Sequence, residues 1–251
     1  MPLKSPSEVA LKVTGITKTY GGVPVLNGID LEVPAGAAFG LVGVNGAGKT
    51  TLIKCLLDFC SVDSGRVDIF GVKHTSPYAR ARMTFVPERF VPPHYLTCRE
   101  FLEWKCSMGG HRFLLSSVNK LFDELRLDPA SLQKPVRQLS KGMTQKLGLA
   151  GSLLVDRDLY LLDEPMSGLD PASRVAVKST LARLTGDGRT LFFTSHVLSD
   201  LEELCSSIGV LDRGAIRFHG SPKKFCERFS QTNLESAFMR CIDLAEPAIA
   251  D

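Results

Sequence analysis

The chain has 251 residues, of which 44% are hydrophobic and 23% are charged, and its formal net charge is +3. This composition is ordinary for a soluble globular protein with a large core, and so small a charge gives no reason to expect a nucleic-acid partner. The seven cysteines are scattered without a Cys-x-x-Cys pair, which excludes a zinc motif and a disulfide framework and indicates reduced thiols in a cytosolic compartment.

The sequence gives no sign of secretion or of a membrane span. The first residues lack the apolar core of a signal peptide, and no apolar run approaches the roughly 18 residues that a bilayer requires. We therefore expect a chain that serves a membrane only through a partner. Residues 10–242 are expected to form one domain, with flexible tails at 1–9 and 243–251.

The first part of the chain predicts strands arranged around one helix. Apolar residues at strand spacing predict a first strand that begins at residue 11 and ends at residues 19–22. Further strands are predicted at residues 23–33, 39–42, 66–70 and 83–86. Behind the third of these strands, residues 51–59 carry apolar side chains at the spacing of one helix face.

The middle of the chain, roughly residues 92–156, predicts a helical insert. Thr97 and Glu100 have the spacing of a capping box before a helical stretch, and Ser140 is a suitable N-cap for a later helix. Strands are predicted again at residues 159–162 and 191–194, a hairpin at 208–218, and short helices within 222–242. Because strands and helices alternate around the insert, the predicted fold class is α/β with a mostly parallel sheet.

Residues 43–50 match the phosphate-binding pattern of Gly, four residues, then Gly-Lys-Ser/Thr, between a buried strand and a helix. Glycines let several backbone N–H groups point at one anion, and the helix N-terminus adds a favourable dipole. Lys49 adds a positive charge, and the Thr50 hydroxyl can ligate Mg²⁺. The residues expected at the phosphates are Gly43, Asn45, Gly46, Ala47, Gly48, Lys49, Thr50 and Thr51. Alone, the loop predicts only that a nucleoside triphosphate binds.

A second motif places two acids after the apolar strand at 159–162. The carboxyl ends of buried strands are where open α/β sheets bind ligands. Asp163 is placed to hold Mg²⁺ opposite Thr50, and Glu164 to orient or deprotonate an attacking water. An Asp-Glu pair after an apolar run is common by itself, but it is much rarer behind a phosphate loop.

Three further segments follow in a defined order. Residues 139–143 read Leu-Ser-Lys-Gly-Met, residues 167–170 read Ser-Gly-Leu-Asp, and Ser195-His196 closes a strand. With these motifs the chain resembles the ATP-binding subunit of ABC transporters over roughly residues 10–242, and it looks most like the drug and polysaccharide export group. The resemblance implies a P-loop NTPase core with an N-terminal antiparallel β lobe and an inserted α-helical lobe.

The resemblance also implies an ATPase that works as a homodimer around two ATP molecules and drives a separate membrane permease from the cytoplasmic side. The implied catalytic residues are Glu164 and His196, and the implied Mg²⁺ ligands are Thr50, Glu88 and Asp163. Further ATP contacts are implied at Tyr20, Ser140, Lys141, Gly142 and Asp170. The signature residues would act on the ATP of the other copy.

The chain departs from the family pattern at three positions. Lys141 replaces the first signature glycine, Met143 replaces the glutamine, and Glu88 stands where the family has the glutamine of its glutamine loop. A helix that begins at Ser140 still offers free N–H groups to a phosphate. The carboxylate of Glu88 can still ligate magnesium, directly or through water.

Several alternatives stay open. The chain could be an importer subunit, a soluble ABC ATPase outside transport, or an ATP-binding regulatory module. Tyr20 could be a packing residue rather than an adenine platform. Phe90, Phe101 and Trp104 are expected in the core of the helical insert, or in a groove where a permease loop docks. Cys55 and Cys60 are expected to be core packing residues.

Overall fold

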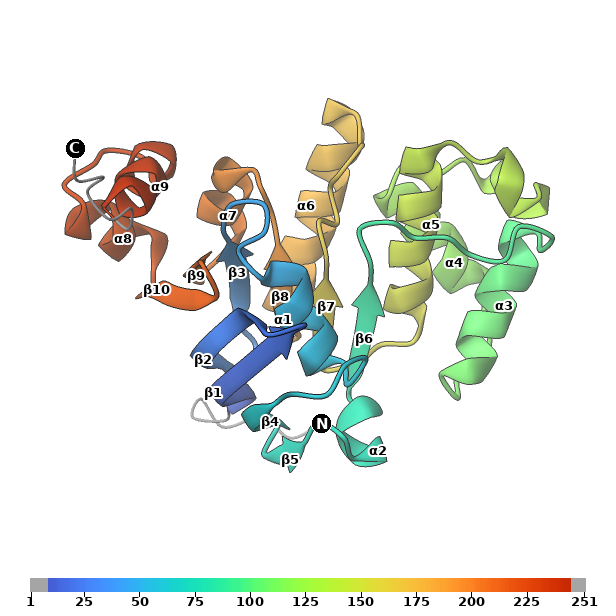
Figure 1. Cartoon of the computed structure of the whole chain (residues 1–251). Coiled ribbons are helices and arrows are strands. Elements are labelled where there is room, and N and C mark those ends of the chain that lie inside the picture. The colour runs from blue at the N-terminus through green and yellow to red at the C-terminus, as the bar shows by residue number, and fades with distance from the viewer. Residues whose placement is uncertain (1–8, 245–251) are drawn as a thin grey trace.

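The computed structural model describes residues 9–244, in which two sheets lie against one another (Figure 1). One sheet has four antiparallel strands in the order β2-β1-β4-β5, and the other has six in the order β10-β9-β3-β8-β7-β6. Strands β6, β7, β8, β3 and β9 pair in parallel, and β10 pairs with β9 in the antiparallel sense. The predicted class, α/β with a mostly parallel sheet and an antiparallel lobe, is confirmed.

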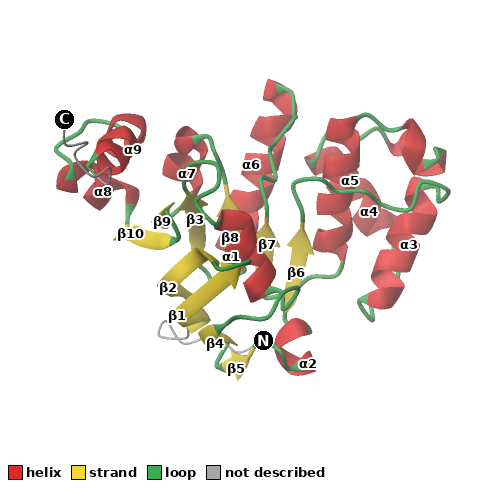
Figure 2. Cartoon of the chain, viewed as in Figure 1, coloured by secondary structure: helices red, strands yellow, loops and turns green. Residues whose placement is uncertain are grey.

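The strands, yellow in Figure 2, have the following bounds. They are β1 (Val9–Tyr20), β2 (Val23–Pro34), β3 (Ala38–Val42), β4 (Ser64–Ile69), β5 (Val72–Lys73), β6 (Met83–Val86), β7 (Leu159–Leu162), β8 (Thr190–Thr194), β9 (Ser207–Asp212) and β10 (Ala215–Gly220). The helices are α1 (Lys49–Leu56), α2 (Pro77–Arg80), α3 (Cys98–Met108), α4 (Leu115–Glu124), α5 (Lys141–Leu154), α6 (Pro171–Gly186), α7 (Leu198–Leu204), α8 (Pro222–Arg228) and α9 (Leu234–Asp243). Two 3-10 turns, Pro129–Gln133 and Val136–Gln138, precede α5.

The six-stranded sheet is covered on both faces at its centre, where every residue of β3, β7 and β8 is buried, and this explains the apolar runs of β3 and β7. Side chains alternate along a strand, so neighbouring residues of β7 belong to different cores. Leu159 and Leu161 pack with α1 and the antiparallel sheet, whereas Tyr160 and Leu162 pack with α5, α6 and the helices that follow. The predicted apolar runs therefore become the central layer of the molecule.

Helix α1 begins and ends earlier than the apolar spacing predicts. Gly48, with a φ of 109°, is its N-cap, so the helix starts at Lys49 rather than at residue 51. Its end is set by Asp58, whose φ of 59° is left-handed and cannot continue the helix. The short elements β5 and α2 were not predicted, because two or four residues carry too little periodicity.

The helical insert lies at one side of the parallel sheet. Figure 1 shows α3, α4 and α5 together beyond β6, whereas α8 and α9 lie at the opposite end of the molecule. The predicted capping box is present at the start of α3, where Thr97 and Glu100 cap one another's backbone N–H groups. Ser140 caps α5, as its position predicts.

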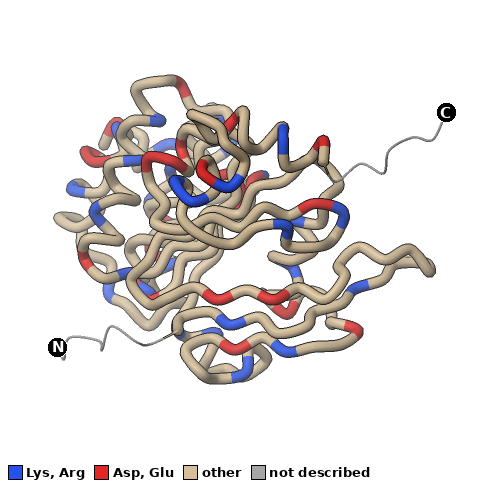
Figure 3. The backbone as a smooth tube through the Cα atoms, turned by 90° about the vertical axis from the view of Figure 1, so that its left-hand side faces the viewer, with Lys and Arg blue, Asp and Glu red and all other residues tan. Residues whose placement is uncertain are grey.

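Charged residues of both signs are interspersed along the chain, as Figure 3 shows. Between residues 9 and 244, the structure contains no helix long and apolar enough to cross a bilayer. The two expected tails lie almost wholly outside the described residues, although Val9 begins β1 and Asp243 ends α9. Their flexibility stays a prediction.

Candidate functional site

The loop at residues 43–50 joins β3 to α1 and needs glycine at two positions. A Cβ on Gly43 would lie 2.2 Å from the carbonyl oxygen of Leu211, so no larger residue fits there. Gly48 takes a left-handed conformation as the N-cap of α1, and no side chain caps that helix. The first N–H groups of α1 are therefore free to meet an anion.

The Lys49 side chain folds back over this loop. Its Nζ donates hydrogen bonds to the carbonyl oxygens of Gly43 at 2.6 Å and Val44 at 3.2 Å. Burial lowers the pKa of Lys49, and the carboxylates of Glu164, Asp163 and Glu88 oppose that shift. The ammonium group is thus held beside the loop and faces three acids.

Asp163 and Glu164 stand at the end of β7 and are linked through a residue of β8. The Thr194 hydroxyl donates to Asp163 Oδ1 at 2.7 Å and accepts the backbone N–H of Glu164 at 2.9 Å. Thr194 is fully buried, and burial raises the pKa of Asp163. This threonine fixes both acids, and sequence reasoning missed it. Its place at the end of a buried strand, just before Ser195-His196, was the signal that could have found it.

Glu164 contacts the histidine that the sequence singled out. His196 Nδ1 lies 2.8 Å from Glu164 Oε2, and the Glu164 side chain is 12% exposed whereas that of His196 is 65% exposed. Burial raises the pKa of Glu164, and His196 is the main opposing influence. Glu164 has a left-handed φ of 48°, which a residue with a Cβ adopts only at a cost in energy.

The phosphate loop, the two acids and His196 line one pocket of about 650 Å³. Of the residues predicted from the sequence, it brings together Asn45, Gly46, Ala47, Gly48, Lys49, Thr50, Thr51, Glu88, Asp163, Glu164 and His196. Val25 of β2 also lines the pocket and was not predicted, because an apolar strand residue carries no signal of a site. A hydroxyl, three carboxylates and a lysine therefore face a glycine-rich helix N-terminus.

The remaining predicted residues do not line this pocket. Ser140 accepts a hydrogen bond from the Met143 N–H at the start of α5, and Asp170 accepts one from the Ser173 N–H at the start of α6. Gly142 and Lys141 belong to the first turn of α5. Gly43, the first residue of the loop, lies against the backbone of Leu211. Tyr20, at the end of β1, is 46% exposed.

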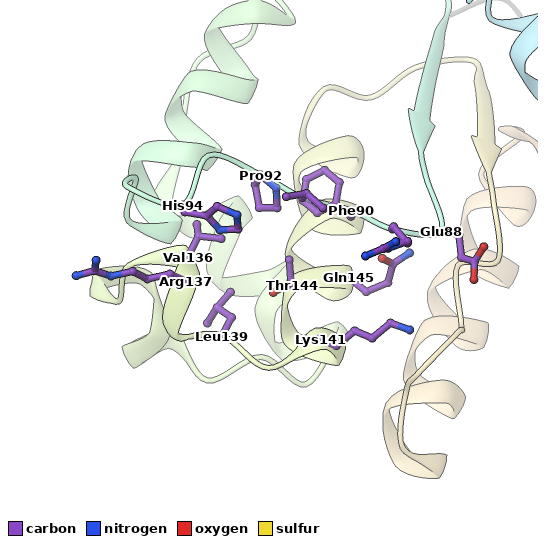
Figure 4. Close-up of a pocket in the computed structure, with 12 residues that line it drawn as sticks. Glu88, Phe90, Pro92, His94, Val136, Arg137, Leu139, Lys141, Thr144 and Gln145 are labelled. Atoms are coloured by element: carbon purple, nitrogen blue, oxygen red, sulfur yellow. The ribbon is translucent and has the colours of Figure 1, made fainter.

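A second hollow, of about 610 Å³, lies between the segment after β6 and the helical insert (Figure 4). Its lining includes Glu88, Phe90 and Gln145, and Gln145 donates to the carbonyl oxygen of Pro87 at 3.3 Å. Phe90 packs edge-on against Phe101, with ring centres 5.6 Å apart. Phe101 is therefore a core residue, as predicted, whereas Phe90 borders the groove and Trp104 is 47% exposed.

Comparison with known proteins gives the family. A family model described as "ABC transporter" matches residues 26–167, more than half of the chain. This chain belongs to the ABC transporter family. The predicted resemblance to an ABC transporter ATP-binding subunit is confirmed.

The ABC transporter relatives include ATP-binding proteins of several bacteria. An uncharacterized ABC transporter ATP-binding protein of Synechocystis is 37% identical over 79% of this chain and 57% of its own length. The Nod factor export ATP-binding protein I of Sinorhizobium fredii is 34% identical over 87% of this chain and 65% of its length. The Nod factor export ATP-binding protein I of Rhizobium leguminosarum is 33% identical over 90% of this chain and 74% of its own length. The chain spans less than two thirds of the first two relatives.

Solved structures give the same fold. An ATP-binding subunit of an ABC transporter superposes with a TM-score of 0.85 at 25% identity, over 93% of this chain and 99% of that chain. A bacterial Atm1-family ABC exporter with ATP bound superposes with a TM-score of 0.79 at 22% identity, over 100% of this chain and 44% of that one. The second likeness is evidence of fold alone.

Proposed function

We propose that this chain hydrolyses ATP and drives a separate membrane permease as the ATPase subunit of an ABC exporter. The observation that carries the proposal is the Glu164–His196 contact at 2.8 Å, in the same pocket as the phosphate loop and Asp163. A base, an orienting histidine and a phosphate cradle are the parts that phosphoryl transfer to water requires.

The loop and Lys49 bind the phosphates of ATP in this proposal. The Lys49 ammonium donates to loop carbonyls, and a bound phosphate would replace those partners with charged oxygens. Helix α1 has no acidic residue in its first turn, so no carboxylate competes for its free N–H groups.

The donor set in the pocket fits Mg²⁺. Thr50 supplies a hydroxyl, and Asp163 and Glu88 supply carboxylate oxygens, the ligand types that Mg²⁺ prefers. Bound Mg²⁺ would neutralise charge that develops on the phosphate oxygens. Thr194 holds Asp163 in place by donating to its Oδ1, so one oxygen stays available to the ion.

Glu164 takes a proton from the attacking water. Burial raises its pKa, which makes the carboxylate a better base than an exposed glutamate, and the hydrogen bond with His196 Nδ1 fixes one oxygen. The backbone N–H bonded to Thr194 fixes the residue from the other side. His196, being mostly exposed, is placed to contact the γ-phosphate.

The proposal includes a homodimer, because the signature residues lie away from the pocket of their own chain. Ser140 caps α5 through its hydroxyl, so the N–H groups of Lys141 and Gly142, at the first two helical positions, are the ones left to meet a phosphate. Asp170, the N-cap of α6, would meet the same ATP. In a second copy these groups would complete the site on the loop of the first.

The groove of Figure 4 is the surface that we propose for the permease. It is bordered by apolar side chains such as Phe90 and Leu139, and it begins at Glu88, which also lines the ATP pocket. A permease segment in this groove would hold residues 10–242, as one domain, at the cytoplasmic side of a membrane. Movement of Glu88 would connect the two sites.

The direction of transport rests on the relatives. Two of the relatives described above are named Nod factor export ATP-binding protein I, which favours export by this chain over import. The acid pair and His196 favour hydrolysis over a purely regulatory ATP-binding role. Identifying the membrane protein that co-purifies with the chain separates export from import and from a role outside transport.

The Glu164→Gln variant tests catalysis. We expect it to bind ATP and to accumulate as an ATP-bound dimer, with a phosphate-release rate lower by roughly 100-fold or more, because the general base is lost. Phosphate release and size-exclusion chromatography with ATP measure the two effects. A near-normal hydrolysis rate would show that Glu164 is not the base.

The Lys49→Ala variant tests the loop. We expect ATP affinity to fall roughly ten-fold or more, since a charged hydrogen bond to phosphate is lost. Lys54→Ala is the matched control, because Lys54 is an exposed lysine in the last turn of the same helix. Isothermal titration measures both, and equal affinities would contradict the loop assignment.

A further inference from the structure

Two cysteines lie close together at the C-terminal end of the phosphate-loop helix. Cys55 is in the last turn of α1 and is fully buried, and Cys60 follows the helix and is half-buried. Their sulfur atoms are 3.5 Å apart. Neither residue lines the ATP pocket. The pair is therefore a separate chemical feature that the function proposed above does not use.

The end of α1 brings the two sulfurs together. The chain turns at Asp58, which has a left-handed φ of 59°, and the N–H groups of Phe59 and Cys60 both reach back to the carbonyl oxygen of Lys54, at 2.9 and 3.4 Å. A disulfide has a sulfur–sulfur distance of about 2.05 Å. The sulfurs must approach by only about 1.5 Å, within reach of a side-chain adjustment at this turn.

The surroundings give the two thiols different roles. Burial raises the pKa of Cys55 to about 12, and the cation of Lys18 opposes part of that rise. Lys18 is itself nearly buried and bonded to Asp63 at 3.1 Å. Cys60 is partly exposed, so an external reagent reaches its sulfur first, whereas Cys55 is buried.

We propose that Cys55 and Cys60 are a reversible modification site that is oxidised to an intrachain disulfide by low-molecular-weight disulfides such as oxidised glutathione. The Cys60 thiolate attacks one glutathione sulfur, the glutathione disulfide breaks, and the released thiolate takes up the proton that Cys60 lost. The sulfur of Cys55 then attacks Cys60, and a second glutathione leaves with the Cys55 proton. One external disulfide is reduced to two thiols as the protein loses two hydrogens.

The disulfide is tested on the purified full chain, first reduced and then treated with oxidised glutathione. Remaining thiols are blocked with iodoacetamide, and trypsin releases residues 55–66, which contain these two cysteines and no other. We expect this peptide to carry no alkyl group and to be lighter by two hydrogens than the reduced, unalkylated peptide. Dithiothreitol should restore both thiols. Full alkylation of both cysteines after treatment, or stable glutathione on Cys60, would overturn the proposal.

Variants separate the two steps. Cys55→Ala is expected to stop at the mixed disulfide, with glutathione left on Cys60, and Cys60→Ser to give no product at Cys55. Cys226→Ser is the control, because Cys226 is also half-buried but lies far along the chain, and its loss should leave the disulfide unchanged. Equal oxidation in Cys60→Ser, or loss of the disulfide in Cys226→Ser, would contradict the assignment.

Discussion

Asp163 and Glu164 are acidic residues whose side chains are largely buried. Burial raises the pKa of each carboxyl group, and it outweighs the hydrogen bond from Thr194 to Asp163 and the contact of His196 with Glu164, which lower the pKa. Charged carboxylates in such a position lower the free energy of unfolding. In the proposed function, a bound cation would offset this cost to stability.

The Asp163→Asn variant is expected to be more stable than the wild type when no ligand is bound. Because the folded pKa of Asp163 lies above its unfolded value of about 3.9, the penalty is absent below that unfolded value and fully present once pH exceeds the folded pKa. The advantage of the variant should therefore be largest at pH 7 and vanish near pH 4. Urea denaturation across this range measures it.

Asp123→Asn is the control for that series, because Asp123 is exposed on α4. We expect it to have the stability of the wild type at every pH. A variant at Asp163 that is less stable than the wild type at pH 7 would mean that the charge is compensated in the ligand-free fold.

At the scale of elements, close packing constrains α5 beside the groove of Figure 4. A Cβ on Gly148 would lie 2.7 to 2.9 Å from ring atoms of Phe90, which borders that groove. Gly186, at the end of α6, has no atom within 4 Å of the same position. The two helical glycines thus differ in the space available for a Cβ.

Replacing each glycine by alanine should change stability in opposite directions. Gly148→Ala is expected to lose about 1 to 3 kcal/mol, because Phe90 must move, whereas Gly186→Ala should gain up to about 1 kcal/mol from helix propensity. Urea denaturation measures both. Equal gains in stability for the two variants would show that the Phe90 side chain can move without a cost in free energy.

At the scale of the whole molecule, the ATP pocket joins elements from both sheets. Val25 comes from the antiparallel sheet, and Asp163 and His196 follow strands β7 and β8 of the parallel one. A ligand that binds there stabilises the folded chain as a unit by mass action. Stability should therefore report on binding even when no ATP is hydrolysed.

ATP with Mg²⁺ is expected to stabilise the Glu164→Gln chain by about 2.7 kcal/mol at 100 times the dissociation constant. The melting temperature, followed by calorimetry, should rise with ATP and fall back in part when EDTA removes the metal. Lys49→Ala at the same concentrations is the control and should show a smaller rise. A melting temperature that is the same with and without ATP would contradict binding at this pocket.

The sequence by itself determined the features that depend on near neighbours in the chain. Residues 43–50 follow a fixed spacing between a strand and a helix, and the capping box at Thr97 and Glu100 closes within one turn. The apolar run at 159–162 indicated a strand buried on both faces. Because local hydrogen bonding and side-chain periodicity set these features, they could be predicted before any contact between distant residues was known.

Tertiary structure alone decided which distant residues meet. The strand order β9-β3-β8-β7-β6 places Thr194 beside Asp163 and Glu164 across 30 residues of chain. Its place just before Ser195-His196 marks a strand end near the site but does not specify the partners of its hydroxyl. The left-handed turn after α1 brings Cys60 against Cys55, a pair that the sequence predicted only as packing residues. Such contacts result from the packing of whole layers, in which the burial of many side chains fixes positions that no local pattern specifies.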